Sequence, residues 1–268
     1  MEGPAKAPRP RPAVRPHRRT AKARSHRRAP RPRRTAAYVK ALGHWREPPA
    51  AAEVRWEKGL RDVTFYSVNW RERVTLRPYR ADGTLDPAAL AALQQVLRDR
   101  RSGESAPVDE RLVRLLYRVA DHFDAPQITV ISGYRTPRRG RTSHHSEGDA
   151  VDFLVPGVPD REVADYARTL GRCGVGIYPT SGFIHLDVRD QSFCWTDVSG
   201  PGQRGRVRQI AADQARAADR RWESAADAPA RRDRPDGVQL IRASPRRPEP
   251  APTGADADVA EAPSEDHE

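Results

Sequence analysis

Charged and apolar residues are distributed so unevenly along this 268-residue chain that only its middle can build a large core. Residues 1–40 contain 14 Lys or Arg, a single acidic residue and many prolines. The last 20 residues contain seven acidic residues and no Lys or Arg. Segments of this kind bury too little apolar surface to offset the entropy lost on ordering. We therefore expect a disordered basic arm over residues 1–40 and an acidic, unfolded end.

The net charge of +12 belongs to the arm, because the other 228 residues carry 34 basic and 35 acidic side chains. The arm could contact an anionic polymer electrostatically. It has no aromatic residues interleaved to stack on bases, so we rank nucleic-acid binding low. No run of 18 apolar residues predicts a transmembrane helix, and no apolar stretch follows the basic start as in a signal peptide.

Secondary-structure patterns begin after residue 57. The alternation in Val63–Val68, followed by Val74–Leu76, predicts a β-hairpin. Asp86 before Pro87 is typical of a helix start. Apolar residues spaced by three and four between Val108 and Phe123 predict the strongest helix in the chain.

The second half of the middle region reads as short strands joined by turns, with one helix. We expect the helix over 160–170 and strands over 127–132, 150–155, 175–178, 183–188 and 193–195. Short connections favour a largely antiparallel sheet, so the predicted class is α+β with helices packed on the sheet.

These patterns predict four parts of the chain. The basic arm, 1–40, leads into an ordered segment, 41–57, and then the folded domain, 58–200. A low-complexity tail, 201–268, follows, with a polar helix as one reading of 205–224. The chain's two cysteines, Cys173 and Cys194, are too few for a disulfide framework. We expect two buried free thiols, with a single bridge as the alternative.

Two stretches of the folded domain carry His and carboxylate residues at suggestive spacings. His145 precedes Asp152, which lies on the following strand, and we expect His145 itself to lie in a loop. His185 and Asp187 are two residues apart on a later strand, so their side chains leave the same face. If the two strands are neighbours, four groups converge in the style of a catalytic zinc site.

Two other interpretations of these His and Asp residues compete with a zinc site. A single His on a strand is more often a satisfied polar residue than a ligand, but two clusters of His with Asp are harder to explain by chance. A non-haem iron triad built on His185 and Asp187 would need a second His downstream. His267, in the acidic end, is the only one.

The same residues lie in motifs that resemble the M15-type peptidoglycan peptidases, in the branch of the murein endopeptidase K group. The resemblance covers roughly 58–200 and rests on Ile131-Ser-Gly-Tyr-Arg-Thr-Pro137, Ser143-x-His-x-x-Gly-x-Ala-x-Asp152 and Gly174-Val-Gly-x-Tyr-Pro-x-Ser-Gly-Phe-x-His-x-Asp187. It implies the small α+β fold that D-alanyl-D-alanine carboxypeptidases share with hedgehog proteins. It also implies a monomer with a zinc cofactor, acting on peptidoglycan peptides.

Carried over by position, the resemblance makes His145, Asp152 and His185 the zinc ligands. Arg135 would stabilise a developing oxyanion or hold a substrate carboxylate. D-Ala-D-Ala dipeptidases place the catalytic Glu where this chain has Gly182, so the general base has to come from elsewhere. Asp187 is the first candidate for it, with Glu147 and His144 as reserves.

The sequence thus predicts a zinc-dependent endopeptidase or carboxypeptidase that cleaves peptide cross-links or stem peptides of bacterial peptidoglycan. The alternative is a non-catalytic, zinc-containing module that binds the cell wall. The expected location is the periplasm or cell envelope, although no export signal is visible. The sequence does not determine which peptide bond would be cut.

Overall fold

The computed structural model describes residue 3 and residues 52–137, 142–199, 205–223, 227–229, 231–232 and 235–241. The chain divides into two units, residues 1–30 and 31–268. Only Gly3 is described in the first unit, so the fold below is that of the second. The predicted arm and acidic end therefore lie outside the described residues, as does the lead-in before Ala52.

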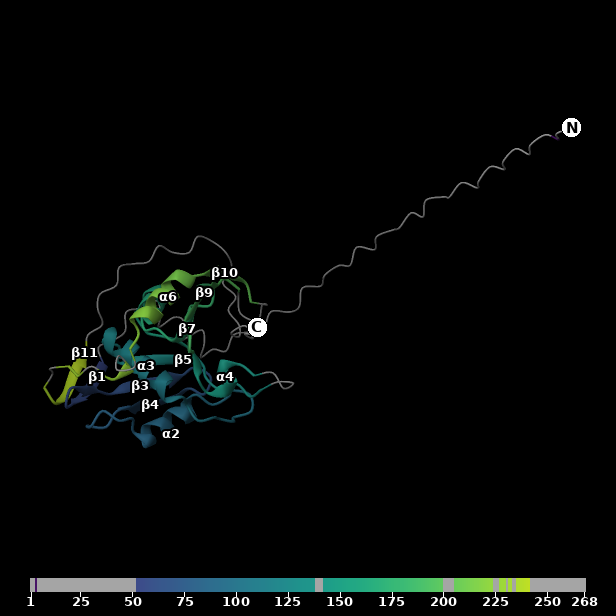
Figure 1. The fold of residues 1–268 in the computed structure, drawn as a ribbon. Helices are drawn as coiled ribbons and strands as arrows, with labels where there is room; N and C mark the ends of the chain where they lie inside the picture. The colour runs from purple at the N-terminus through teal and green to yellow at the C-terminus, as the bar shows by residue number, and fades with distance from the viewer. Residues whose placement is uncertain are drawn as a thin grey trace. The chain divides into compact units, whose positions relative to one another are not determined.

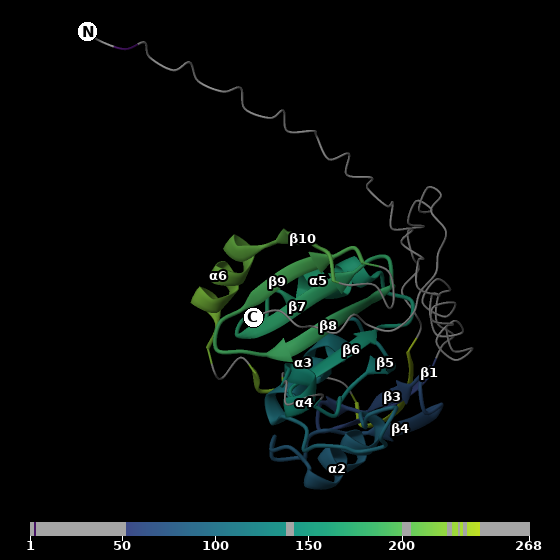
Figure 2. The same ribbon diagram turned by 90° about the vertical axis from the view of Figure 1, so that its right-hand side faces the viewer.

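An eight-stranded sheet forms the centre of the second unit, with the strand order β10-β9-β7-β8-β6-β5-β3-β4 (Figures 1 and 2). Five of the seven pairings are antiparallel and two, β3 with β5 and β7 with β9, are parallel. The strands are β3 (Val63–Ser67), β4 (Glu72–Leu76), β5 (Gln127–Ser132), β6 (Ala150–Leu154), β7 (Cys173–Tyr178), β8 (Phe183–Val188), β9 (Phe193–Asp197) and β10 (Val207–Ile210). The α+β class and the largely antiparallel sheet are confirmed.

The parallel pairing of β7 with β9 was not expected, because the short connection between β8 and β9 suggests an antiparallel hairpin of those two strands. Only four residues separate β8 from β9, yet β9 lies beyond β7 and runs parallel to it. The connection crosses the start of β7, where the Arg189 N–H donates to the Arg172 carbonyl at 3.1 Å. The Cys173 N–H likewise donates to Ser192 Oγ at 3.3 Å. These contacts bring the beginning of β9 beside the beginning of β7.

Helices cover one face of the sheet. The longer ones are α2 (Pro87–Val96), α3 (Glu110–His122), α5 (Asp160–Ala167) and α6 (Ala212–Arg221). Asp86 caps α2 as its sequence predicts, accepting from the Ala88 N–H at 3.1 Å. All four helices contribute buried residues to one core, which includes Leu93, Leu116, Val163 and Ala215. Inward-facing strand residues such as Val151 and Phe153 complete that core.

The opposite face of the sheet carries a smaller cluster of buried residues, namely Val68, Ile131, Leu154, Tyr178, Phe183 and Trp195. Successive strand residues point to opposite faces. Asp152, between Val151 and Phe153, therefore shares this second face with Leu154, and His185 shares it with Phe183. The candidate ligands on the strands thus project away from the helical core.

The region after residue 200 is more structured than expected. The predicted polar helix begins later, as α6, and β10 precedes it. A further strand, β11 (Gly237–Ile241), pairs with β1 (Ala52–Glu57), which also pairs with β2 (Leu60–Arg61). The low-complexity reading missed β11 because its partner strand lies some 180 residues earlier, and pairing at that separation leaves no local signal. The boundaries between the four predicted parts stay a prediction.

No helix in the described ranges is long and apolar enough to cross a membrane. Cys173 and Cys194 are both buried free thiols, as the preferred interpretation had it.

Candidate metal centre

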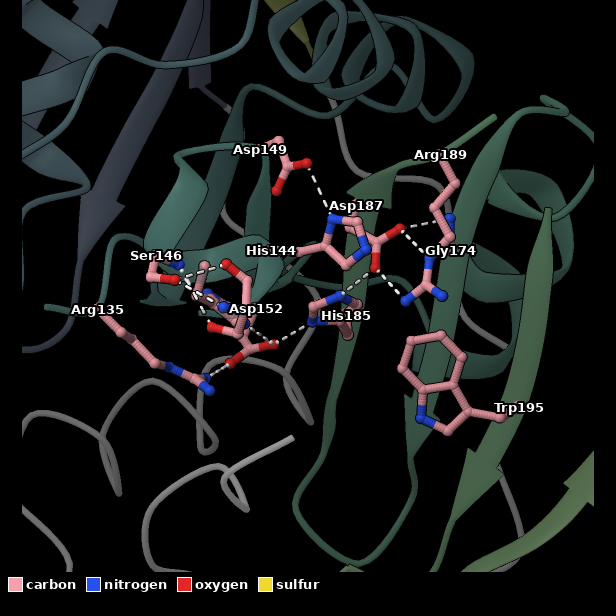
Figure 3. A network of polar contacts seen from close by, with 12 residues as sticks. Arg135, His144, Ser146, Asp149, Asp152, Gly174, His185, Asp187, Arg189 and Trp195 are labelled. Atoms are coloured by element: carbon pink, nitrogen blue, oxygen red, sulfur yellow. Dashed lines mark hydrogen bonds and ion pairs between the residues drawn. The ribbon is translucent and has the colours of Figure 1, made fainter. Parts of the chain in front are cut away.

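Three candidate ligands meet on the face of the eight-stranded sheet opposite the helical core. His145 belongs to the short helix α4 (His144–Glu147), Asp152 to β6 and His185 to β8. Asp152 and His185 are direct partners in the antiparallel register of β6 and β8, so their side chains stand side by side. All three side chains are buried, and one donor atom from each lies within 4.8 Å of the others. Figure 3 shows the Asp152 carboxylate beside the His185 ring.

The segment expected to be a loop contains one turn of helix. Ser143 caps α4, and the Ser143 N–H in turn donates to Ser146 Oγ at 2.6 Å, which completes a capping box. Gly148 ends the helix, and its carbonyl accepts from the Asp109 N–H at 3.1 Å. A Ser three residues after a Ser is a weaker capping signal than the usual Glu or Gln. The turn nevertheless fixes the position from which His145 faces the sheet.

Each imidazole has one nitrogen committed to an acceptor outside the cluster. His145 Nδ1 lies 2.7 Å from the Gly133 carbonyl oxygen. Because a carbonyl only accepts, this nitrogen carries the proton and Nε2 presents a lone pair. His185 Nε2 lies 3.0 Å from Asp187 Oδ2, and a proton on this nitrogen leaves the lone pair of His185 on Nδ1.

Both remaining nitrogens point at the same oxygen of Asp152. His185 Nδ1 is 3.0 Å from Asp152 Oδ1, and His145 Nε2 is 3.4 Å from it. His145 Nε2 is buried and has no hydrogen-bond partner among the described residues. Two nitrogen lone pairs and a carboxylate oxygen facing one another repel unless a cation lies between them. The donor set therefore fits a zinc ion, which takes histidine nitrogen and carboxylate oxygen.

The electrostatics favour the ligand forms of these side chains. Burial, together with the charge of Arg135, lowers the pKa of His145 and keeps the imidazole neutral. Burial opposes ionisation of Asp152, but its contacts with His145, Arg135 and His185 outweigh it and lower the pKa of Asp152. Near neutral pH the cluster thus holds a carboxylate and at least one neutral imidazole, which is what metal binding requires.

The Gly133-Tyr134-Arg135 motif supports this cluster from β5. A Cβ at Gly133 would lie 2.4 Å from the Leu97 carbonyl oxygen, so only glycine lets the backbone approach α2 and aim its own carbonyl at His145. The Arg135 guanidinium forms an ion pair with Asp152 Oδ2 and donates to Ser132 Oγ at 3.0 Å. Arg135 therefore orients Asp152 in this structure, and its side chain remains about one-quarter exposed.

The structure separates the other predicted residues from the three donors. Asp187 was expected to converge with them, but it contacts the far nitrogen of His185 and so lies on the other side of that ring. His144 faces Asp149, with Nδ1 2.9 Å from Asp149 Oδ2, and this hydrogen bond raises the pKa of His144. Glu147 is exposed, and one of its oxygens lies within 4.8 Å of donor atoms of His144 and Asp149.

Sequence reasoning missed Arg189, which forms an ion pair with Asp187. A signal was present, because residues 185, 187 and 189 share the two-residue spacing of one strand face. It also missed Asp149, whose contact with His144 depends on the turn at the end of α4.

Known proteins resemble this chain over the region that contains the three candidate ligands. The sequence model of the family described as peptidoglycan L,D-endopeptidase MepK, an M15 peptidase family, matches residues 55–192. A probable peptidoglycan L,D-endopeptidase MepK of Haemophilus influenzae is 35% identical over 141 residues, which cover 48% of this chain and 75% of that protein. The peptidoglycan L,D-endopeptidase MepK of Escherichia coli K12 is 32% identical over 111 residues, covering 37% of this chain and 61% of that protein. No solved structure matches the chain.

The fold and the donor set define an α+β protein with a buried site of metal-ligand type. The family match spans half the chain and includes all three candidate ligands. The chain belongs to the M15 peptidase family of the MepK type, as its motifs predicted.

Proposed function

We propose that this protein is a zinc-dependent peptidoglycan endopeptidase of the cell envelope. The observation that carries the proposal is the convergence of His145 Nε2 and His185 Nδ1 on one oxygen of Asp152, with the other nitrogen of each ring already engaged. Family membership supplies the reaction class, because the matched relatives are named as peptidoglycan L,D-endopeptidases. We also propose that the chain has the small α+β fold that D-alanyl-D-alanine carboxypeptidases share with hedgehog proteins, as the family resemblance implies.

In this proposal His145, Asp152 and His185 would hold zinc, and a fourth position would remain for water. Zinc, when bound, lowers the pKa of that water toward neutrality and polarises the carbonyl to be cleaved. The protein contributes neutral imidazoles, held by the Gly133 carbonyl and Asp187, and a carboxylate held by Arg135.

Arg135 has a second possible contribution, toward substrate. Its guanidinium contacts Asp152 through one nitrogen, and the side chain is about one-quarter exposed. A guanidinium stays charged and donates in a planar fork, so it can bind a carboxylate on either edge. We propose that Arg135 orients Asp152 and presents its exposed edge to a substrate carboxylate or to the developing oxyanion.

The proton-transfer group is best sought on α4. Both oxygens of Asp187 accept hydrogen bonds, and the carboxylate lies across the His185 ring from the metal donors, which argues against its acting as the base. Glu147 is exposed beside His144 and Asp149, two residues from His145 in the chain. We propose Glu147 as the general base, with His144 as its alternative.

Digestion of purified cross-linked muropeptides tests the function. We expect zinc-loaded protein to cut the L,D cross-links that the relatives' names specify and to lose this activity in a chelator. Release of single terminal D-alanine residues would instead identify a carboxypeptidase. Glu147→Gln should retain zinc and lose turnover, and retained turnover would direct attention to His144→Gln. Unchanged muropeptides across a panel of stem types would contradict the proposal.

A non-catalytic module that binds the cell wall is the second candidate. It is favoured by Gly182 at the position where dipeptidases of the resembled group carry their catalytic Glu, together with the engagement of Asp187 by Arg189. Sedimentation of the zinc-loaded protein with purified sacculi, without release of soluble fragments, would support this candidate over the enzyme. The basic arm's contact with anionic polymers and the monomeric state are proposals that the same sedimentation and a solution mass measurement can check.

A further inference from the structure

Asp187 is a buried carboxylate whose two oxygens are both fixed by donors. Oδ1 accepts from Arg189 Nε at 2.7 Å and from the Gly174 N–H at 2.7 Å. Oδ2 accepts from Arg189 at 2.6 Å and lies 3.0 Å from His185 Nε2 (Figure 3). Asp187 is therefore a fixed acceptor behind the ring of His185.

A fixed acceptor at Nε2 determines how His185 presents itself to the cluster. A neutral imidazole can carry its proton on either nitrogen, and the two tautomers offer different lone pairs. A carboxylate held at Nε2 favours the tautomer protonated there, which turns the Nδ1 lone pair toward Asp152. Asp152 Oδ1 lies 3.0 Å from Nδ1, the same distance as Asp187 Oδ2 from Nε2, so the two carboxylates compete for the His185 proton. Groups that hold Asp187 against Nε2 therefore favour the tautomer that suits metal binding.

The sequence around Asp187 makes room for this arrangement. Gly174 is the direct partner of Asp187 in the register of β7 and β8. A Cβ on Gly174 would lie 2.2 Å from Asp187 Oδ1 and 2.5 Å from Arg189 Nε, so any side chain there would displace both groups. The Arg189 guanidinium also lies over the rings of Phe193 and Trp195, 5.4 and 5.7 Å from their centroids. These contacts place Arg189 where it can hold Asp187 by two hydrogen bonds.

We propose that Arg189 is a positioning residue that acts through Asp187 to set the tautomer of His185 and thereby strengthens zinc binding. The inference rests on the proposed zinc site and gives Asp187 a role other than that of general base. It also accounts for Gly174 in the Gly-Val-Gly motif, because only glycine leaves space for Asp187 and Arg189.

Zinc affinity of the full chain, measured by competition with a chelator, tests the inference separately from turnover. Loss of a partner that orients a ligand typically weakens metal binding about 10- to 100-fold. We expect Arg189→Leu to show a loss of that size, and Arg189→Lys to recover part of the affinity through one remaining hydrogen bond. The matched control is Arg161→Leu, because Arg161 is an arginine on α5 whose side chain is 80% exposed.

Arg189→Leu leaves the buried Asp187 carboxylate without its cation. The double variant Asp187→Asn/Arg189→Leu therefore serves as a second test, because it removes that uncompensated carboxylate as well. Nitrogen-15 NMR of labelled histidine in the zinc-loaded protein reports which nitrogen of His185 is protonated. We expect protonated Nε2 in the wild type and a loss of that preference in the double variant.

Unchanged zinc affinity and unchanged protonation of His185 in both variants would overturn the inference. Zinc binding that falls as expected while muropeptides stay intact would support the inference and contradict the proposed enzymatic function. A wild-type chain that does not bind zinc would overturn both.

Discussion

Two buried ionic clusters lie on two different sheets, and their polar atoms are satisfied in opposite ways. Arg61, at the end of β2, is completely buried. Its guanidinium donates to the carbonyls of Ala120 at 3.3 Å and Ala125 at 2.8 Å, and Asp124 lies 3.7 Å away. In the metal centre, by contrast, one nitrogen of each imidazole faces the same oxygen of Asp152, and His145 Nε2 has no hydrogen-bond partner among the described residues.

The difference separates a structural polar cluster from a ligand site. The Arg61 guanidinium donates to carbonyls at and just after the end of α3, so donors meet acceptors. In the metal centre the lone pair of His145 Nε2 instead faces a carboxylate oxygen, and these two buried acceptors are stable side by side only if a cation or proton is added. Burial and charge are common to both clusters, and the balance of donors and acceptors distinguishes them.

The largest effect should follow His145→Ala, which removes one of three converging donors. We expect zinc binding and muropeptide cleavage to fall below detection. Zinc at 100 times its Kd should stabilise the wild type by about 2.7 kcal/mol, and this zinc-dependent rise in Tm should vanish in the variant. Full zinc-dependent stabilisation of His145→Ala, measured by thermal unfolding with and without zinc, would remove the distinction between the clusters.

The opposite pattern is expected for Arg61→Met. Removing this guanidinium takes a buried donor from the Ala125 carbonyl, whereas the Ala120 carbonyl keeps the Ala125 N–H at 2.8 Å, and an unsatisfied buried group costs about 1–3 kcal/mol. We expect a lower free energy of unfolding in urea and an unchanged zinc affinity. A loss of zinc affinity matching that of the metal-site variants would show that the two clusters are coupled.

A smaller effect on the metal centre is expected from Gly133→Ala. The added Cβ would meet the Leu97 carbonyl, so the Gly133 carbonyl has to shift away from His145 Nδ1. We expect zinc affinity to fall about 10-fold, which is the lower end of the loss that follows when a group orienting a metal ligand is displaced. Chelator competition measures it, and an unchanged affinity would mean that His145 is oriented by its packing alone.

The smallest effect is expected at the two cysteines. Burial raises the pKa of both thiols, that of Cys194 to about 11, so little thiolate is present near neutral pH. We expect no alkylation of the native protein by iodoacetamide over an hour at pH 7.5, and full alkylation in urea. Rapid labelling of the native protein would show that the region around β7 and β9 opens readily.

Spacing in the sequence was enough to predict that His145, Asp152 and His185 approach one another, whereas their assignment as the zinc ligands came from the family resemblance and stays a prediction. His145 and Asp152 lie in a motif with fixed glycine and alanine positions, and the two-residue spacing of His185 and Asp187 places them on one strand face. Once β6 and β8 pair, Asp152 stands opposite His185 without further information. The helices α2 and α3 were likewise readable, from a cap before proline and from apolar spacing.

The features that were not predicted depend on contacts between residues far apart in sequence or on the orientation of a single side chain. The same spacing that gathered His185 and Asp187 could not reveal that Asp187 binds the far nitrogen, because this depends on Arg189 and the Gly174 N–H. Strand β11 has a partner some 180 residues earlier, and β9 bypasses its sequence neighbour β8. Neither pairing is encoded in local periodicity.

X-ray absorption at the zinc edge, on protein loaded with one equivalent of zinc, tests the central claim most directly. The account predicts nitrogen and oxygen ligands at about 2.0–2.2 Å, with the scattering pattern of two imidazoles that is lost in His145→Ala. Sulfur ligands at about 2.3 Å would place the metal at the cysteines instead, and that result, or a failure to retain zinc, would contradict a metal centre at His145, Asp152 and His185.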